Sequence, residues 1–122
     1  MQEIVESFIL EIRRGAVILA VLSQLKREQY GYALIQTLND EGFKIDQGTL
    51  YPLLRRLESQ KILSSSWDTG SSRPKKYYVL TDFGNEVYIE LVREFKKLSK
   101  SIYNLMGENY DWKLLYEGCP IS

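Results

Sequence analysis

Residues 47–81 constrain the fold of this 122-residue chain more than any other segment. In its first part, roughly 47–60, apolar residues recur at helical spacing on one side only, and polar or basic residues occupy the other side. Two short stretches of β-favouring residues follow at 62–67 and 75–80, joined by a Ser/Gly-rich basic turn. The segment therefore predicts a helix with one buried face, followed by a β-hairpin with a positively charged turn.

The helix predicted at 47–60 separates a leucine face from a polar face. Asp46 is suited to cap its N-terminus, which places Pro52 deeper than the first turn that proline prefers, so we expect Pro52 to bend the helix or the start to shift. The expected buried face consists of Leu50, Leu53, Leu54 and Leu57, and the opposite face of Gly48, Pro52, Arg55 and Ser59.

Helices are expected on both sides of this segment. Apolar spacing predicts helical stretches at 4–12 and 15–25, with the second largely buried, and a further helix at 30–41 that Gly42 ends. A long helix is expected at 82–106, after a cap at Thr81. Helices followed by two strands and a long helix give a fold that is mainly α with a small β-wing, a winged helix-turn-helix plus a long C-terminal helix. We expect two parts, 1–81 and 82–122, in one compact unit.

Composition argues against several classes of function. The chain has no histidine and a single cysteine, Cys119, so we expect no enzyme activity, no metal site and no cofactor. The longest apolar run, Ala16–Leu22, is seven residues long, far below the roughly 20 that cross a bilayer. We therefore expect no membrane association and a cytoplasmic location.

Charge is segregated along the chain although the net charge is zero. Residues 43–81 hold seven basic and three acidic residues, a net charge of +4, so the remainder carries −4. Such segregation directs a polyanion to one face of a molecule. An ordinary solvated surface is the alternative interpretation of the same charges.

An exposed helix with basic, amide and hydroxyl side chains has the size and donors to enter a DNA major groove. Arg55 and Gln47 could read base edges, whereas Thr49 and Tyr51 more often touch phosphate. By strand alternation Tyr77 and Tyr78 face opposite ways, so at least one belongs to the core, and Trp67 is expected to pack under the wing. The alternative is that the Arg55–Arg56 pair is merely solvated.

Three motifs resemble the PadR-like transcriptional regulators: GYALIQTL at 31–38, GTLYPLLRRLESQKIL at 48–63 and RPKKYYVLTDFG at 73–84. The single C-terminal helix is similar to that of the short subfamily. One departure is at Gln60–Lys61, where the family often has an acidic or basic residue followed by glycine, so that Lys61 stands at the glycine position. The resemblance implies a homodimer, usually a repressor, that leaves its operator when a small molecule or other signal arrives. We expect DNA contacts, mostly by this match, from Tyr32, Gln47, Thr49, Tyr51, Pro52, Arg55, Arg73, Lys75 and Lys76.

Dimerisation is also expected from the long helix, because its apolar stripe extends beyond a small domain and has to be covered. A second copy is the economical cover; folding of the helix onto its own domain is the alternative. The expected dimer residues are Phe8, Val87, Leu91, Phe95, Leu98, Ile102 and Leu105. We expect an apolar gap between the two halves at Phe95, lined also by Phe8, Tyr88 and Val92, and the resemblance implies that a small aromatic or apolar effector binds there. The alternative is that these residues are plain core.

The sequence thus predicts a homodimeric, sequence-specific DNA-binding regulator of transcription. The rival hypothesis is a winged-helix module that binds protein partners and never DNA. The basic helix and wing favour the first, since a protein-only module has little reason to concentrate positive charge there.

Overall fold

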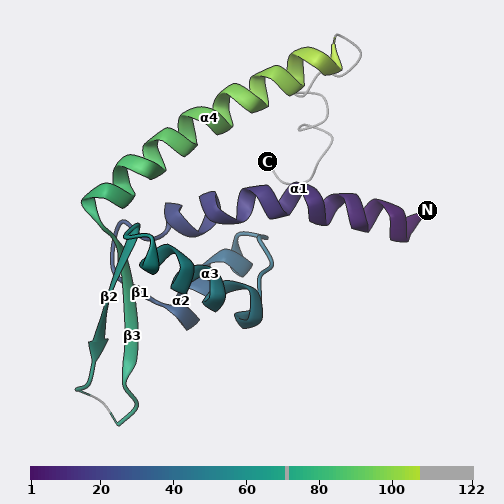
Figure 1. Ribbon diagram of the computed structural model, residues 1–122. Helices are drawn as coiled ribbons and strands as arrows, with labels where there is room; N and C mark the ends of the chain where they lie inside the picture. Colours follow the sequence, from purple (N-terminus) through teal and green to yellow (C-terminus); the bar gives the residue numbers. More distant parts are fainter. Residues whose placement is uncertain (71, 108–122) are drawn as a thin grey trace. The chain divides into compact units, whose positions relative to one another are not determined.

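The computed structural model describes residues 1–70 and 72–107 (Figure 1). The chain is mostly helical with one small antiparallel sheet, as the sequence predicted. The helical stretches expected at 4–12 and 15–25 form one continuous helix. In chain order the elements are α1 (Gln2–Ser23), β1 (Gln29–Tyr30), α2 (Gly31–Asp40), α3 (Gln47–Ser59), β2 (Leu63–Asp68), β3 (Lys75–Leu80) and α4 (Asp82–Met106).

The chain divides into two compact units within α4. The first spans Met1–Ile89 and contains β1, β2 and β3, and the second begins at Glu90. The division therefore falls about two helical turns into α4 rather than at its start. Among the helices of residues 1–70 and 72–107, none combines the length and apolar character needed to cross a bilayer.

The core of the first unit is built by leucines from three helices and the hairpin. Leu50, Leu54 and Leu57 of α3 are all 0% exposed, whereas Leu53 is half-buried. Full burial of such a side chain contributes about 1.5–3 kcal/mol. Of the stretch 15–25, only its C-terminal end is fully buried. The other core residues are Val21, Leu22, Leu25, Leu34, Leu38, Ile62, Leu63 and Tyr78.

The sheet has three strands in the order β1-β3-β2, all antiparallel. The two-residue β1, which is too short for a sequence pattern to reveal, pairs Tyr30 with Tyr77 of β3. Tyr78 is buried, and Tyr77 packs edge-on against Tyr30 with ring centres 5.7 Å apart. The prediction that the two tyrosines face opposite ways and that one belongs to the core is confirmed.

The prediction that Trp67 packs under the wing is wrong. On its face of β2, exposure rises outward from Leu63, which is 2% exposed, to Trp67, which is 62% exposed. Trp67 pairs with Lys76 near the outer end of the hairpin, four residues beyond Leu63. The hairpin therefore reaches past the leucine core, and Trp67 lies on its projecting part.

Both α2 and α3 end in a turn whose first residue after the helix cap has a positive φ. At the end of α2, Gly42 has φ +85°, and the Phe43 amide donates to the Leu38 carbonyl at 2.8 Å. At the end of α3, Lys61 takes the same role with φ +66°, and the Ile62 amide donates to the Leu57 carbonyl at 3.0 Å. Lys61 thus occupies the left-handed position that glycine normally fills.

The start of α4 is fastened to the turn that follows α3. The Thr81 hydroxyl accepts from the Gly84 amide at 2.8 Å and donates to the Lys61 carbonyl at 2.7 Å, and the Thr81 amide donates to the Ile62 carbonyl. Gly84 is buried so close to that carbonyl that a Cβ at this position would lie 2.0 Å from its oxygen. Only glycine allows the helix to start here.

Candidate nucleic-acid interface

The exposed face of α3 is held by a side-chain cap and by its leucines. One Asp46 carboxylate oxygen accepts from the Thr49 amide at 2.9 Å, which confirms Asp46 as the N-cap. Pro52 lies in the second turn, and the helix nevertheless continues to Ser59. Because proline has no amide hydrogen, Pro52 cannot donate the usual helical hydrogen bond to the Gly48 carbonyl. Gly48 is exposed, so water can donate to this carbonyl instead. The exposed residues of this face are Gln47, Gly48, Thr49, Pro52, Arg55, Arg56 and Ser59.

Arg13 of α1 ties down the loop that leads into α3. Its guanidinium donates to the Lys44 carbonyl and lies over the Phe43 ring, 4.9 Å from the ring centre. Asn39 adds a second tie, because its side-chain oxygen accepts from the Ile45 amide at 3.0 Å. The N-terminus of α3 is therefore positioned by both preceding helices.

Tyr51 differs from the other residues of the expected reading face because it is half-buried. Its ring covers Gly31 at the start of α2, where a Cβ would lie 2.4 Å from the ring and 2.7 Å from the hydroxyl oxygen. Nearby in sequence, Tyr32 is 53% exposed, and α2 has no side-chain cap at its N-terminus. The Tyr51 hydroxyl therefore lies beside a helix N-terminus, where the partial positive charge favours an anion.

The two lysines at the start of β3 have different surroundings. Lys75 is exposed and its ammonium lies 4.6 Å from the centre of the Tyr30 ring. Lys76 is half-buried and its ammonium lies 3.2 Å from the Glu58 carboxylate of α3. Arg73, in the turn before β3, is exposed. Of the two lysines, Lys76 is thus the one paired with an acidic side chain on another element.

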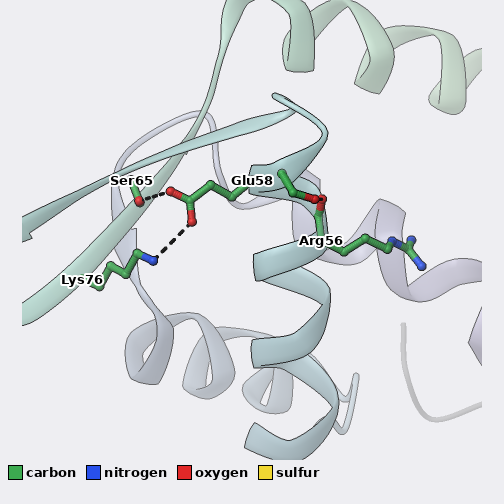
Figure 2. Close-up of polar contacts among 5 residues, drawn as sticks. Arg56, Glu58, Ser65 and Lys76 are labelled. Atoms are coloured by element: carbon green, nitrogen blue, oxygen red, sulfur yellow. Dashed lines mark hydrogen bonds and ion pairs between the residues drawn. The ribbon is translucent and has the colours of Figure 1, made fainter.

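Figure 2 shows the polar cluster around Glu58, while Arg56 points away from it. The other oxygen of the Glu58 carboxylate accepts a hydrogen bond from the Ser65 hydroxyl of β2. This bond and the nearby Lys76 outweigh partial burial and hold the pKa of Glu58 below its ordinary value. Burial alone would lower the pKa of Lys76, but the hydrogen bond to Glu58 and nearby charges raise it. Both groups are therefore charged at neutral pH.

Sequence reasoning missed Glu58 as part of this site. It is one ordinary acidic residue on the flank of a helix, and Ser65 and Lys76 lie on two different strands. Their meeting depends on the hairpin register, in which Ser65 pairs with Tyr78 and Trp67 with Lys76. A charge count along the chain does not reveal such a register.

The residues predicted for dimerisation and ligand binding are spread over both units. In the first unit, Phe8 is 60% exposed, Val87 is half-buried, and Tyr88 is half-buried with the Lys26 ammonium 5.7 Å from its ring centre. In the second, Leu91 and Val92 are half-buried. The remaining stripe residues are exposed: Phe95 by 49%, Leu98 by 56%, Ile102 by 42% and Leu105 by 85%. Their roles stay predictions.

In the described part of the chain, no group of three or more acidic, cysteine or histidine residues is placed to hold a metal ion. Cys119 lies outside the described residues.

Comparisons with known proteins place this geometry in a family. Residues 18–90, from the last turns of α1 into α4, match the transcriptional regulator PadR-like family. A transcriptional regulator from Mycobacterium tuberculosis is 32% identical over 93 residues, which cover 75% of this chain and 87% of that protein.

Solved structures show the same likeness. A PadR family transcriptional regulator from Eggerthella lenta is 47% identical, with a TM-score of 0.84, over 88% of this chain and 96% of that one. A PadR-like transcriptional regulator from Bacillus cereus is 31% identical, with a TM-score of 0.71, over 80% of this chain and 97% of that one.

Proposed function

Because this chain belongs to the PadR-like family of transcriptional regulators, we propose that it binds duplex DNA sequence-specifically as a homodimer. In this proposal it represses transcription in the cytoplasm until a small molecule or another signal releases it. The observation that carries the proposal is α3, in which Leu50, Leu54 and Leu57 are fully buried while the opposite face presents polar and basic side chains to solvent.

Base reading falls to the exposed face of α3. Arg55 can donate two parallel hydrogen bonds to a guanine edge, and Gln47 can pair with adenine, in a groove wide enough for one helix. Thr49 and Pro52 lie on the same exposed face and set how closely the helix approaches the bases. Each good two-bond pair discriminates against the wrong base by about 1–3 kcal/mol.

Phosphate contacts come from the two ends of this surface. Arg73 and Lys75 lie on the exposed outer part of the wing, and Lys76, half-buried beside Glu58, is not assigned a phosphate. At the other end, Tyr32 and the Tyr51 hydroxyl lie at the N-terminus of α2. Such contacts fix the register of the protein on the duplex and carry most of the sequence-independent affinity.

A homodimer supplies the second reading helix. The exposed apolar side chains of α1 and α4, among them Phe8, Phe95 and Leu98, favour association with a second copy. Two-fold symmetry then spaces the two α3 helices by roughly 34 Å, one turn of DNA, and predicts a palindromic operator. For the effector we propose a small aromatic or apolar molecule.

The test is to select bound fragments from a random-sequence duplex library and to repeat the selection with Arg55→Ala. We expect a palindromic motif for the unaltered protein and loss of preference at one base pair per half-site for the variant. Arg56→Ala is the matched control, because it removes the same charge from the neighbouring position. Uniform weakening with an unchanged motif would reassign Arg55 to phosphate, and no selection of DNA at all would favour the protein-binding module.

A further inference from the structure

The two adjacent lysines of β3 cannot reach the same surface. Side chains of consecutive strand residues point to opposite faces of a sheet. Lys75 lies on the face with Tyr30 and Tyr77, where its ammonium stands over an aromatic ring and keeps its N–H groups available to an anion. Lys76 lies on the face with Trp67 and Tyr78, which also receives Glu58 from α3.

Three side chains lie around the Lys76 ammonium on that face. Its nitrogen lies 3.2 Å from a Glu58 carboxylate oxygen, 5.3 Å from the centre of the Tyr78 ring and 5.9 Å from the Trp67 ring. The Ser65 hydroxyl, on the same face of the hairpin, holds the second Glu58 oxygen and so fixes the carboxylate (Figure 2). Lys76 is 30% exposed and Glu58 33%. The lysine charge is therefore met from within the chain by a carboxylate that is itself anchored.

This arrangement matters for charge more than for stability. A half-exposed ion pair contributes only about 0–1 kcal/mol to folding. A lysine contributes to DNA affinity, in contrast, by replacing counterions on a phosphate, and it can do so only if no carboxylate on the protein already holds it. Through Ser65 of β2 and Lys76 of β3, Glu58 also joins the end of α3 to both strands of the wing. Glu58 therefore affects both the charge of the wing and its angle to α3.

We infer that Glu58 is a positioning residue that withholds Lys76 from the DNA backbone, an inference that rests on the proposed DNA binding. The wing then meets phosphate with Lys75, while Lys76 holds the wing to α3. Loss of the Glu58 charge frees Lys76, which adds sequence-independent affinity to a surface that otherwise reads bases through α3. Glu58 thereby sets how much of the binding is specific.

The experiment measures binding to a labelled duplex of mixed sequence over a range of salt concentrations. Log affinity falls as log salt rises, and each phosphate contact adds about 0.9 to the magnitude of that slope, which is the quantity compared between variants. Lys75→Gln should lower the slope by about 0.9 per wing, hence about 1.8 for a dimer, and Lys76→Gln should leave it unchanged. Glu58→Gln, which can still accept from Ser65, should raise it by the same amount. Between 50 and 200 mM salt, 0.9 corresponds to about a 3.5-fold change in affinity.

The double variant Glu58→Gln/Lys76→Gln isolates the cause. We expect it to return to the slope of the unaltered protein, which a general loosening of the wing would not produce. Glu86→Gln removes one exposed acidic charge from α4 and is the control for net charge. Equal slope losses for Lys75→Gln and Lys76→Gln, or a Glu58→Gln slope that does not depend on Lys76, would overturn this inference alone. A protein that binds no duplex would instead remove the proposed function and this inference with it.

Discussion

Two helices of this chain carry similar apolar stripes and bury them differently. Leu50, Leu54 and Leu57 of α3 are fully buried within the chain, whereas Phe95 and Leu98 of α4 are about half exposed. Both stripes have helical spacing, and the pattern alone does not separate them. Periodicity thus identifies which face of a helix is apolar, but not whether the same chain or another molecule covers it.

The largest expected effect is on the α3 stripe. Leu54→Ala should lower the free energy of unfolding by about 2–5 kcal/mol, because the core around a fully buried leucine collapses only in part. Urea unfolding measures this, and the loss should not vary with protein concentration. Leu53→Ala, at a half-buried position on the same helix, is the matched control and should cost clearly less. Equal losses at the two positions would contradict the burial described for α3.

The α4 stripe should respond in association rather than in folding. Leu98→Ala should weaken the proposed dimer by about 3 kcal/mol, because each of two copies loses about 1.5 kcal/mol of apolar burial. This corresponds to roughly a hundredfold rise in the dimer dissociation constant, measured by sedimentation equilibrium. Lys100→Ala, two residues on and on the far side of the helix, should change little. If the unaltered protein were monomeric at micromolar concentration, no second copy would cover the α4 stripe. The proposed contrast between α3 and α4 would then be wrong.

Much of the α3 region was predictable because its signals are local. The Asp46 cap, Gly42 after α2 and the Thr81 cap of α4 follow from residues a few positions apart, and the structure confirms each. Of the four leucines predicted to be buried in α3, Leu50, Leu54 and Leu57 are fully buried and Leu53 is half-buried. The long-range contacts were not predictable. The ring of Tyr51 over Gly31, the pairing of the two-residue β1 and the Glu58–Lys76 pair depend on how elements distant in sequence meet.

One of these contacts makes the position of α3 sensitive to a single methyl group. Gly31→Ala should destabilise the protein by about 1–3 kcal/mol, because the new Cβ overlaps the Tyr51 ring and the neighbouring elements have to move. Gly48→Ala is the matched control: its Cβ meets only an Asp46 oxygen at 3.5 Å, so helix propensity should make it neutral or stabilising. Urea unfolding of the two variants compares them, and a stable Gly31→Ala protein would show that Tyr51 does not press on α2.

A smaller effect, of opposite sign, is expected at the end of α3. Lys61 has φ +66°, a conformation that costs a residue with a Cβ about 1 kcal/mol or more. Lys61→Gly relieves that cost but gains chain entropy in the unfolded state, so the net stabilisation should be about 0.5–1 kcal/mol. Lys61→Ala keeps the unfavourable backbone and removes the charge, so it should not stabilise. Thermal unfolding of the two variants distinguishes backbone strain from charge. If strain is the cause, Lys61→Gly is stabilised and Lys61→Ala is not, whereas a charge effect would change both variants alike.

The smallest effect concerns how α3 is joined to the wing, and it depends on pH. The folded pKa of Glu58 is lowered, so its contribution to stability is complete above the ordinary value of 4.5 and is lost as the pH falls through the lowered pKa. The folded pKa of Lys76 is raised, so its contribution is complete below 10.5 and is lost as the pH rises through the raised pKa. The difference in unfolding free energy between the unaltered protein and Glu58→Gln should therefore form a plateau, about 0.5 kcal/mol high, that declines at both ends. A difference that stays constant from pH 3 to pH 7 would mean that the Glu58 charge does not hold the wing, because the acid limb of the plateau comes from this carboxylate.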